Sequence, residues 1–127
     1  MSWRPPAAKK MIGIDIVKIT RIKTLAQKPA FLARVFTENE IAYYRAAGER
    51  AETLAGMYAL KEAAAKALGT GFTSFGLRDI EITHNESGAP NAAFTGKAGE
   101  IFEKTGAARA ECSISHEKEY AVAVCRF

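Results

Sequence analysis

The sequence predicts an α+β fold, in which an antiparallel sheet packs against one long helix and several shorter helices. Three stretches support this prediction. MIGIDIVKI (11–19) is aliphatic and β-branched like a strand, AETLAGMYALKEAAAKAL (51–68) is rich in helix-forming alanine and leucine, and ARAECSISHEKEYAVAVCRF (108–127) has the pattern of two strands joined by a polar turn. Helices are therefore expected mostly early in the chain and strands mostly late, with the first strand joining the late ones.

The composition is that of one soluble globular domain. The chain has 127 residues, of which 48% are hydrophobic and 25% are charged, and this length suits one domain rather than two. We interpret residues 1–10 as a flexible N-terminal extension and residues 11–127 as a single domain. No apolar run reaches the roughly 18 residues of a membrane span, and no apolar stretch of signal-peptide length follows the basic N-terminus. A cytoplasmic protein with no membrane partner is expected.

The net charge of +4 is compatible with an anionic partner, although mildly basic proteins are common. No run of lysine and arginine is dense enough to predict a nucleic-acid-binding arm. Cys112 and Cys125 lack the spacing of a metal site. They could face each other across the C-terminal hairpin, and in a cytosolic protein we expect them to be reduced.

The first elements follow from local patterns. The stretch 11–19 carries apolar side chains on both sides, which predicts a strand buried on both faces. Residues 19–28 are amphipathic, and a helix there would place Arg21 and Lys28 within reach of one exposed stripe.

The next helices have recognisable ends. Thr37 followed by Glu40 forms a capping box, so a helix should span about 38–48. The long helix over 51–68 should end at Gly69, which suits the left-handed position after a helix.

The second half of the chain favours strands. We expect a strand over 77–84, a turn at 86–88, a short strand near 92–95, a short helix over 97–106, and a terminal hairpin that turns at 117–119.

Asp15 places a charge in the middle of the first apolar strand. A buried carboxylate costs several kcal/mol unless its charge is satisfied. Asp15 is therefore a candidate ligand.

Glu62 and Lys66 lie four residues apart on one face of the long helix. The simplest interpretation is a surface ion pair worth about 0.3–0.5 kcal/mol. Small residues around the pair, however, would let a backbone or a ligand approach closely. The helix also leads into Gly69 and Gly71, a loop whose backbone could wrap a phosphate.

His116 ends the stretch SISH (113–116). A histidine at a strand end is more often structural than catalytic. Strand alternation points Ser113 and Ser115 away from His116, which disfavours a serine nucleophile with this histidine. No HxxxH, HExxH or CxxC spacing occurs, so a closed zinc site is not expected.

Taken together, Asp15 and Glu62 suit Mg²⁺, which binds one or two carboxylates and fills its remaining positions with water and substrate phosphates. Lys66 and His116 would neutralise charge on a phosphoryl group or accept a proton. The residues alone thus indicate Mg²⁺-dependent handling of a diphosphate.

Four motifs in order and spacing resemble the holo-[acyl-carrier-protein] synthases, the short 4′-phosphopantetheinyl transferases. They are GIDIVKITRI, KEAAAKALGTG, DIEITHNESGAPNAAFTG and SISHEKEYAVAV, and the resemblance covers residues 11–127. It implies the 4′-phosphopantetheinyl transferase-like fold. It also implies transfer of 4′-phosphopantetheine from coenzyme A to a serine of apo acyl carrier protein, with release of adenosine 3′,5′-bisphosphate, in support of fatty acid biosynthesis.

The resemblance also implies roles for particular residues. Asp15 and Glu62 would be the Mg²⁺ ligands, and Lys66 would contact phosphate and serve as a base, with a metal-bound water held by Glu62 as the competing base. His116 would contact the coenzyme A phosphates. Gly69, Gly71 and Pro90 would belong to the nucleotide pocket.

Two further implications concern partners. Arg21, six residues after Asp15, resembles the family's basic contact on the helix that docks the acidic carrier protein, and Lys28 is a second candidate. The family's short members resemble homotrimers with active sites between subunits.

The chain departs from the family pattern at two helix positions. Tyr58 stands where many members carry tryptophan or phenylalanine. Met57 stands where many members carry a basic residue. The contact that this basic residue would make with coenzyme A could come instead from Arg45, Arg50 or Lys61. Another Mg²⁺-dependent diphosphate transferase or hydrolase, and a degenerate copy that binds without turnover, are the alternatives.

Overall fold

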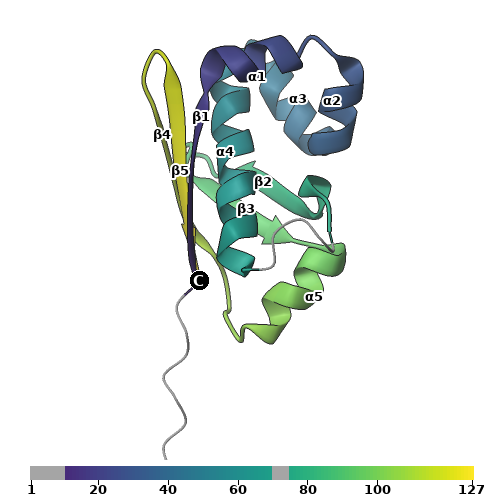
Figure 1. Cartoon of the computed structure of the whole chain (residues 1–127), viewed down its shortest axis with the longest axis vertical. Helices are drawn as coiled ribbons and strands as arrows, with labels where there is room; N and C mark the ends of the chain where they lie inside the picture. The colour runs from purple at the N-terminus through teal and green to yellow at the C-terminus, as the bar shows by residue number, and fades with distance from the viewer. Residues whose placement is uncertain (1–10, 70–74) are drawn as a thin grey trace, which may run out of the picture.

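The computed structural model describes residues 11–69 and 75–127; the predicted extension 1–10 and residues 70–74 lie outside the described residues. The main sheet has three strands in the order β1-β5-β4, and both neighbouring pairs are antiparallel. Its strands are β1 (Ile12–Lys18), β4 (Glu111–His116) and β5 (Tyr120–Arg126). The first strand of the chain therefore lies beside the last one (Figure 1).

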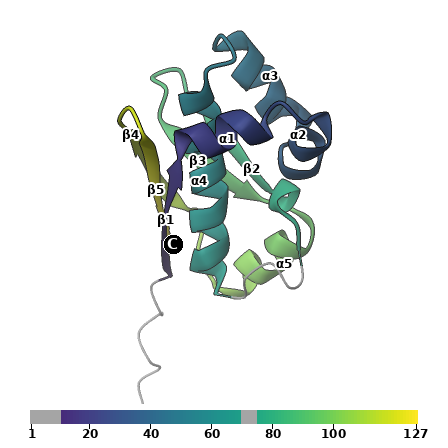
Figure 2. The same cartoon turned by 45° about the horizontal axis from the view of Figure 1, so that its top comes forward.

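Helix α4 (Ala51–Leu68) lies against one face of this sheet and runs through the middle of the molecule (Figure 1). A second, two-stranded antiparallel sheet lies on the other side of α4 (Figure 2). The remaining elements are α1 (Ile19–Leu25), α2 (Pro29–Val35), α3 (Glu38–Ala46), a 3₁₀ turn (Leu77–Asp79), β2 (Ile80–His84), β3 (Pro90–Phe94) and α5 (Gly96–Lys104). α1, α2 and α3 gather at one end of the molecule, and α5 lies at the other.

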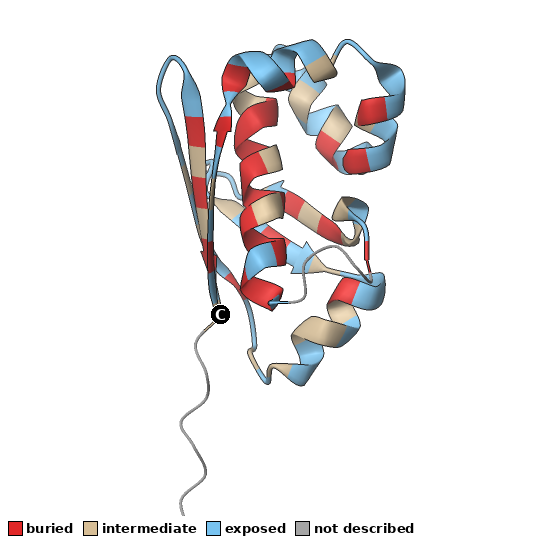
Figure 3. Cartoon of the chain, in the orientation of Figure 1, coloured by how far each residue is buried: buried red, intermediate tan, exposed pale blue. Residues whose placement is uncertain are grey.

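The core is centred on α4, which is buried along most of its length (Figure 3). Its alanines let β1 approach closely: a Cβ on Gly13 would collide with the carbonyl oxygen of Ala63. Only glycine fits at that position, so Gly13 lets β1 pack closely against α4. The helix ends at Gly69, whose φ of 78° is left-handed as predicted.

A buried ion pair fixes α3 against α4 and β2. Lys61 Nζ lies 2.7 and 2.8 Å from the two carboxylate oxygens of Glu40 and 2.5 Å from the carbonyl oxygen of Ile80. Glu40 also accepts hydrogen bonds from the backbone N–H groups of Thr37 at 2.8 Å and Ile82 at 2.7 Å. Both charged side chains are 0% exposed. The capping-box glutamate is therefore also the counter-ion of a core lysine.

Most of the predicted elements are confirmed. The long helix spans 51–68 as expected, and the Thr37 capping box starts α3. The helix predicted over 19–28 is too long: it ends at Leu25, and α2, which was not predicted, begins at Pro29. A residue before a proline disfavours the helical conformation, and Lys28, which precedes Pro29, has an extended backbone, so it is not on the same helix as Arg21. The strand predicted from residue 77 begins only at Ile80, after the 3₁₀ turn.

The prediction that the first strand is buried on both faces is wrong for the single chain. Gly13 and Val17 face α4 and are buried, but Ile12, Ile14 and Ile16 are 66%, 62% and 64% exposed. The reason is that one layer of helix covers only one face of the sheet. β1 thus leaves an apolar strip uncovered. Within the described part of the chain, no helix is long and apolar enough to cross a membrane.

Candidate active site

Asp15 lies on the α4-facing side of β1, where it meets Lys66 in the last turn of α4. Lys66 Nζ is 2.9 Å from Asp15 Oδ1 and 3.1 Å from the carbonyl oxygen of Ile14. The side chain of Asp15 is 16% exposed and that of Lys66 is 56% exposed. The charge that was unexplained in the apolar strand is therefore balanced by a lysine from the helix, at an edge strand open to solvent.

Glu62 stands one turn before Lys66 and joins this cluster. Partial burial raises the pKa of Glu62, hydrogen bonding with Tyr58 lowers it, and the negative charge of Asp15 raises it again. The positive charges of Lys66 and Arg21 lower it. Because these groups act on one carboxyl group, the fold brings Asp15, Glu62, Lys66 and Arg21 into one site.

Arg21 reaches the site from α1. Its guanidinium carbon is 5.9 Å from the centre of the Tyr58 ring, a cation–π distance. Burial raises the pKa of Tyr58, and the neighbouring Glu62 raises it further. Sequence reasoning noted Tyr58 only as a departure from a pattern. Its spacing of four from Glu62, and of eight from Lys66, was the signal that it shares their face.

His116 lies at the opposite edge of the sheet. Its strand, β4, is separated from β1 by β5. On β5, His116 pairs with Ala121, whereas Asp15 pairs with Ala123. It lines a hollow with Glu52, Glu117 and Lys118. One chain therefore does not place His116 in the Asp15 cluster.

The other predicted site residues are scattered. Pro90 begins β3 in the second sheet, paired with His84, and Lys28 is exposed between α1 and α2. Gly69 follows the turn that holds Lys66, whereas Gly71 lies outside the described residues.

The basic residues that could replace a contact from the Met57 position differ in their exposure to solvent. Met57 and Lys61 are 0% exposed, so Lys61 is excluded as a surface contact. Arg50 lies 3.1 Å from Glu52, which shares the hollow of His116. Arg50 therefore lies near the hollow lined by His116, which is itself predicted to contact the coenzyme A phosphates.

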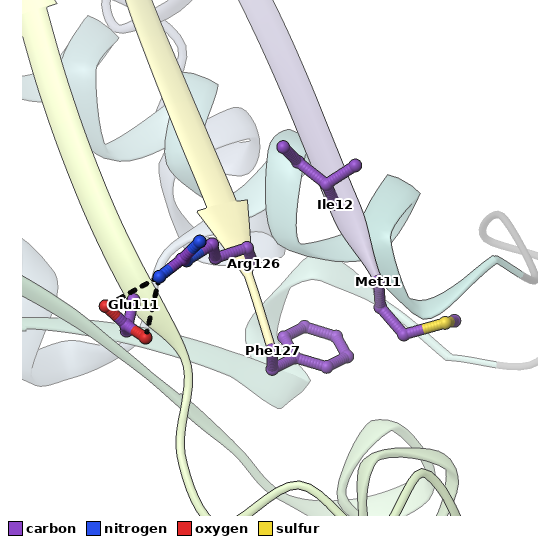
Figure 4. A pocket seen from close by; sticks show the side chains of 5 residues that line it. All are labelled: Met11, Ile12, Glu111, Arg126 and Phe127. Atoms are coloured by element: carbon purple, nitrogen blue, oxygen red, sulfur yellow. Dashed lines mark hydrogen bonds and ion pairs between the residues drawn. The ribbon is translucent and has the colours of Figure 1, made fainter. Parts of the chain in front are cut away.

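A separate hollow of about 290 Å³ lies where the ends of the described chain meet (Figure 4). Met11, Ile12, Glu111, Arg126 and Phe127 line it. Arg126 and Glu111 are paired at 3.3 Å, and the hollow contains none of the clustered residues. Its shape alone does not identify it as the reactive centre.

The donors at the Asp15 cluster suit a hard divalent cation. Among the residues that the structure describes, no group of three or more histidine, cysteine, aspartate or glutamate side chains could hold a metal ion. Asp15 and Glu62 would supply only oxygen ligands and leave most coordination positions to water or phosphate. This donor set fits Mg²⁺ and does not fit a closed zinc site.

Comparisons with known proteins identify the family. The family model described as the 4′-phosphopantetheinyl transferase superfamily matches residues 11–125. The holo-[acyl-carrier-protein] synthase of Clostridium novyi (strain NT) is 47% identical over 113 residues, which cover 88% of this chain and 82% of that protein.

Solved structures give the same result. The Helicobacter pylori holo-[acyl-carrier-protein] synthase in complex with coenzyme A matches with a TM-score of 0.78 and 34% identity, covering 91% of this chain and 97% of that one. The Neisseria meningitidis synthase matches with a TM-score of 0.81 and 35% identity, covering 91% and 95%. The chain therefore belongs to the 4′-phosphopantetheinyl transferase superfamily, within its holo-[acyl-carrier-protein] synthase family of enzymes.

Proposed function

We propose that this chain transfers 4′-phosphopantetheine from coenzyme A to a serine of apo acyl carrier protein, with Mg²⁺ as cofactor, and so supports fatty acid biosynthesis in the cytoplasm. The observation that carries the proposal is the cluster of Asp15, Glu62 and Lys66. It combines two carboxylates with a lysine held at one edge of the sheet. The coenzyme A complex of the Helicobacter pylori relative supports the choice of substrate.

In the proposed reaction the serine oxygen of the carrier attacks the phosphorus next to the pantetheine. The diphosphate P–O bond breaks, adenosine 3′,5′-bisphosphate leaves, and the serine proton passes to a base. Asp15 and Glu62 would hold Mg²⁺, which when bound would neutralise the diphosphate charge.

Lys66 is suited to binding phosphate in this reaction. Its Nζ is already held by Asp15 and by the Ile14 carbonyl oxygen, so it is positioned before a substrate arrives. An ammonium that is paired with Asp15 must lose its own proton before it can take one from serine. The present geometry therefore favours the phosphate-contact role of Lys66 over the role of base.

We further propose that the working form is a homotrimer with its sites between subunits. The exposed strip of Ile12, Ile14 and Ile16 supports association through the outer face of the sheet, since such an apolar strip is costly to leave in water. A second copy would also explain how His116, which stands apart from Asp15 within one chain, could reach a site.

The carrier protein would dock beside the cluster. Arg21 is exposed on α1 at the site, and Lys28 is exposed between α1 and α2. Basic residues near the reactive centre would attract an acidic carrier and orient its serine.

The test is to incubate the protein with coenzyme A, Mg²⁺ and an apo acyl carrier protein and to measure the carrier by intact-mass spectrometry. A gain of one 4′-phosphopantetheine group is expected, and its loss when the acceptor serine is replaced by alanine places the modification. Glu100→Gln, at an exposed position on α5, is a control variant that should retain activity.

The same assay separates the alternatives. Consumption of coenzyme A without a modified carrier would indicate a hydrolase. Binding of coenzyme A with no product, while a control synthase is active, would indicate a copy that binds without turnover. Either result would overturn the proposed transfer.

A further inference from the structure

The two cysteines form a pair that the proposed transfer does not use. Cys112 on β4 is directly opposite Cys125 on β5, and their sulfur atoms are 3.7 Å apart. Both are free thiols. The sheet register itself therefore holds the two sulfur atoms face to face.

The hydrogen-bonding pattern defines the kind of pair. The N–H of Glu117 donates to the carbonyl oxygen of Tyr120, which marks a hydrogen-bonded pair, and such pairs alternate with non-hydrogen-bonded ones along an antiparallel ladder. Cys112 lies an odd number of residues from Glu117, so the cysteines occupy a non-hydrogen-bonded pair. The Cα atoms of such pairs are about 4.5 Å apart, within the range of about 4.4–6.8 Å that a disulfide spans.

The sulfurs need only a small movement to bond. A disulfide bond is about 2.05 Å long, so a separation of 3.7 Å has to close by about 1.7 Å. Side-chain rotation can supply part of this movement, since the Cα atoms already lie in register. Strands β4 and β5 therefore need not separate for the disulfide to form.

The two thiols differ in access and in acidity. Cys125 is buried, whereas Cys112 is only partly buried. Hydrogen bonding between the thiols lowers the pKa of Cys112, and the same contact together with burial raises the pKa of Cys125. Cys112 is accordingly the thiol that would react first with a small oxidant.

We propose that Cys112 and Cys125 are a site of reversible oxidation, at which hydrogen peroxide or an organic hydroperoxide produces an intramolecular disulfide between β4 and β5. In the first step the Cys112 thiolate attacks the peroxide oxygen, the O–O bond breaks, and hydroxide or alkoxide leaves a sulfenic acid on Cys112. In the second step the Cys125 sulfur attacks the Cys112 sulfur. The S–S bond forms, and the sulfenic oxygen leaves as water with the thiol proton. A dithiol reductant restores both thiols.

This modification is independent of the transfer reaction, so its test is a chemical one. The reduced full chain is treated with hydrogen peroxide under native conditions, quenched with catalase, denatured and alkylated. We expect a loss in mass of two hydrogen atoms, no alkylation at either cysteine, and a peptide that joins the segments containing Cys112 and Cys125. Dithiothreitol should restore alkylation at both positions.

Single substitutions test the order of the steps. In Cys125→Ser, peroxide should leave a sulfenic acid on Cys112 that a 1,3-diketone traps, whereas Cys112→Ser should give no adduct on the buried Cys125. Two alkylated cysteines after peroxide treatment of the wild type, or a disulfide that joins two chains, would overturn the proposal. A diketone adduct on Cys125 but not on Cys112 would overturn the assigned order.

Discussion

Replacing Lys61 by methionine should destabilise the fold strongly without affecting the binding of coenzyme A. Methionine is close to lysine in volume, so the change removes the ammonium and leaves Glu40 charged in a site where both side chains were 0% exposed. Removing one partner of a buried ion pair costs about 3–5 kcal/mol. With a urea dependence of about 2 kcal/mol/M, the unfolding midpoint should fall by about 2 M.

The assay is urea unfolding followed by circular dichroism, at equal protein concentrations because association also changes apparent stability. Lys97→Met is the matched control. Lys97 and Glu100 form a pair at 3.4 Å whose side chains are 58% and 64% exposed, so its loss should cost less than about 0.5 kcal/mol. If Lys61→Met costs no more than Lys97→Met, the reasoning about the buried pair is refuted.

A second substitution tests the cause of the loss. Adding Glu40→Gln to Lys61→Met removes the unpaired charge but keeps an amide oxygen that can accept from the backbone. It should recover about 1–3 kcal/mol relative to the sum of the single changes. At temperatures where Lys61→Met is folded, its KM for coenzyme A should equal that of the wild type, and a rise of about fivefold or more would restore Lys61 as a phosphate contact.

Four other changes are predicted. Asp15→Asn should lower kcat/KM by at least about 100-fold in the carrier-modification assay while the circular dichroism spectrum is retained; wild-type turnover would exclude Asp15 as a ligand. Arg21→Ala should raise the KM for the acidic carrier by about tenfold, measured against ionic strength, and an unchanged KM would refute the docking role. Ile14→Glu should shift the sedimentation coefficient to that of a monomer, because a charge would enter the apolar strip; an unchanged oligomer would place the interface elsewhere. Burial lowers the pKa of His84, so the unfolded chain binds its proton more readily and stability should fall as pH drops below about 6.5. His84→Gln should reduce the dependence of the urea midpoint on pH in this range. An equally steep dependence would mean that His84 is not its source.

Local sequence patterns predicted the elements that short-range chemistry controls. The Thr37 and Glu40 capping box, the helix over 51–68 and the turn at its Gly69 end depend on residues within a few positions of one another, and all three are present. Residue chemistry suggested that Asp15 acts together with Glu62 of the long helix, but it did not predict the ion pair between Asp15 and Lys66. Nothing in the strand itself indicates which distant lysine will lie beside it.

Other features depend on packing that the sequence does not display. Lys61 has the appearance of a surface lysine, and only the fold shows that Glu40 and the Ile80 carbonyl oxygen surround it. Periodicity also missed that β1 is an edge strand with one open face, because an apolar residue looks the same whether a helix or another copy of the chain covers it. The contact between Tyr58 and Arg21 could not be predicted, because Arg21 lies on a different helix.

The alternation along β1 connects the two halves of the proposed function. Gly13, Asp15 and Val17 face α4, and the isoleucines between them face outward. The same seven-residue strand therefore presents the candidate metal ligand on one face and the candidate subunit interface on the other. Since Gly13 seats the strand against the carbonyl oxygen of Ala63, a shift of the strand on the helix would move both faces together. Association through the outer face should then hold Asp15 against Lys66, so that assembly and the geometry of the reactive cluster depend on one another.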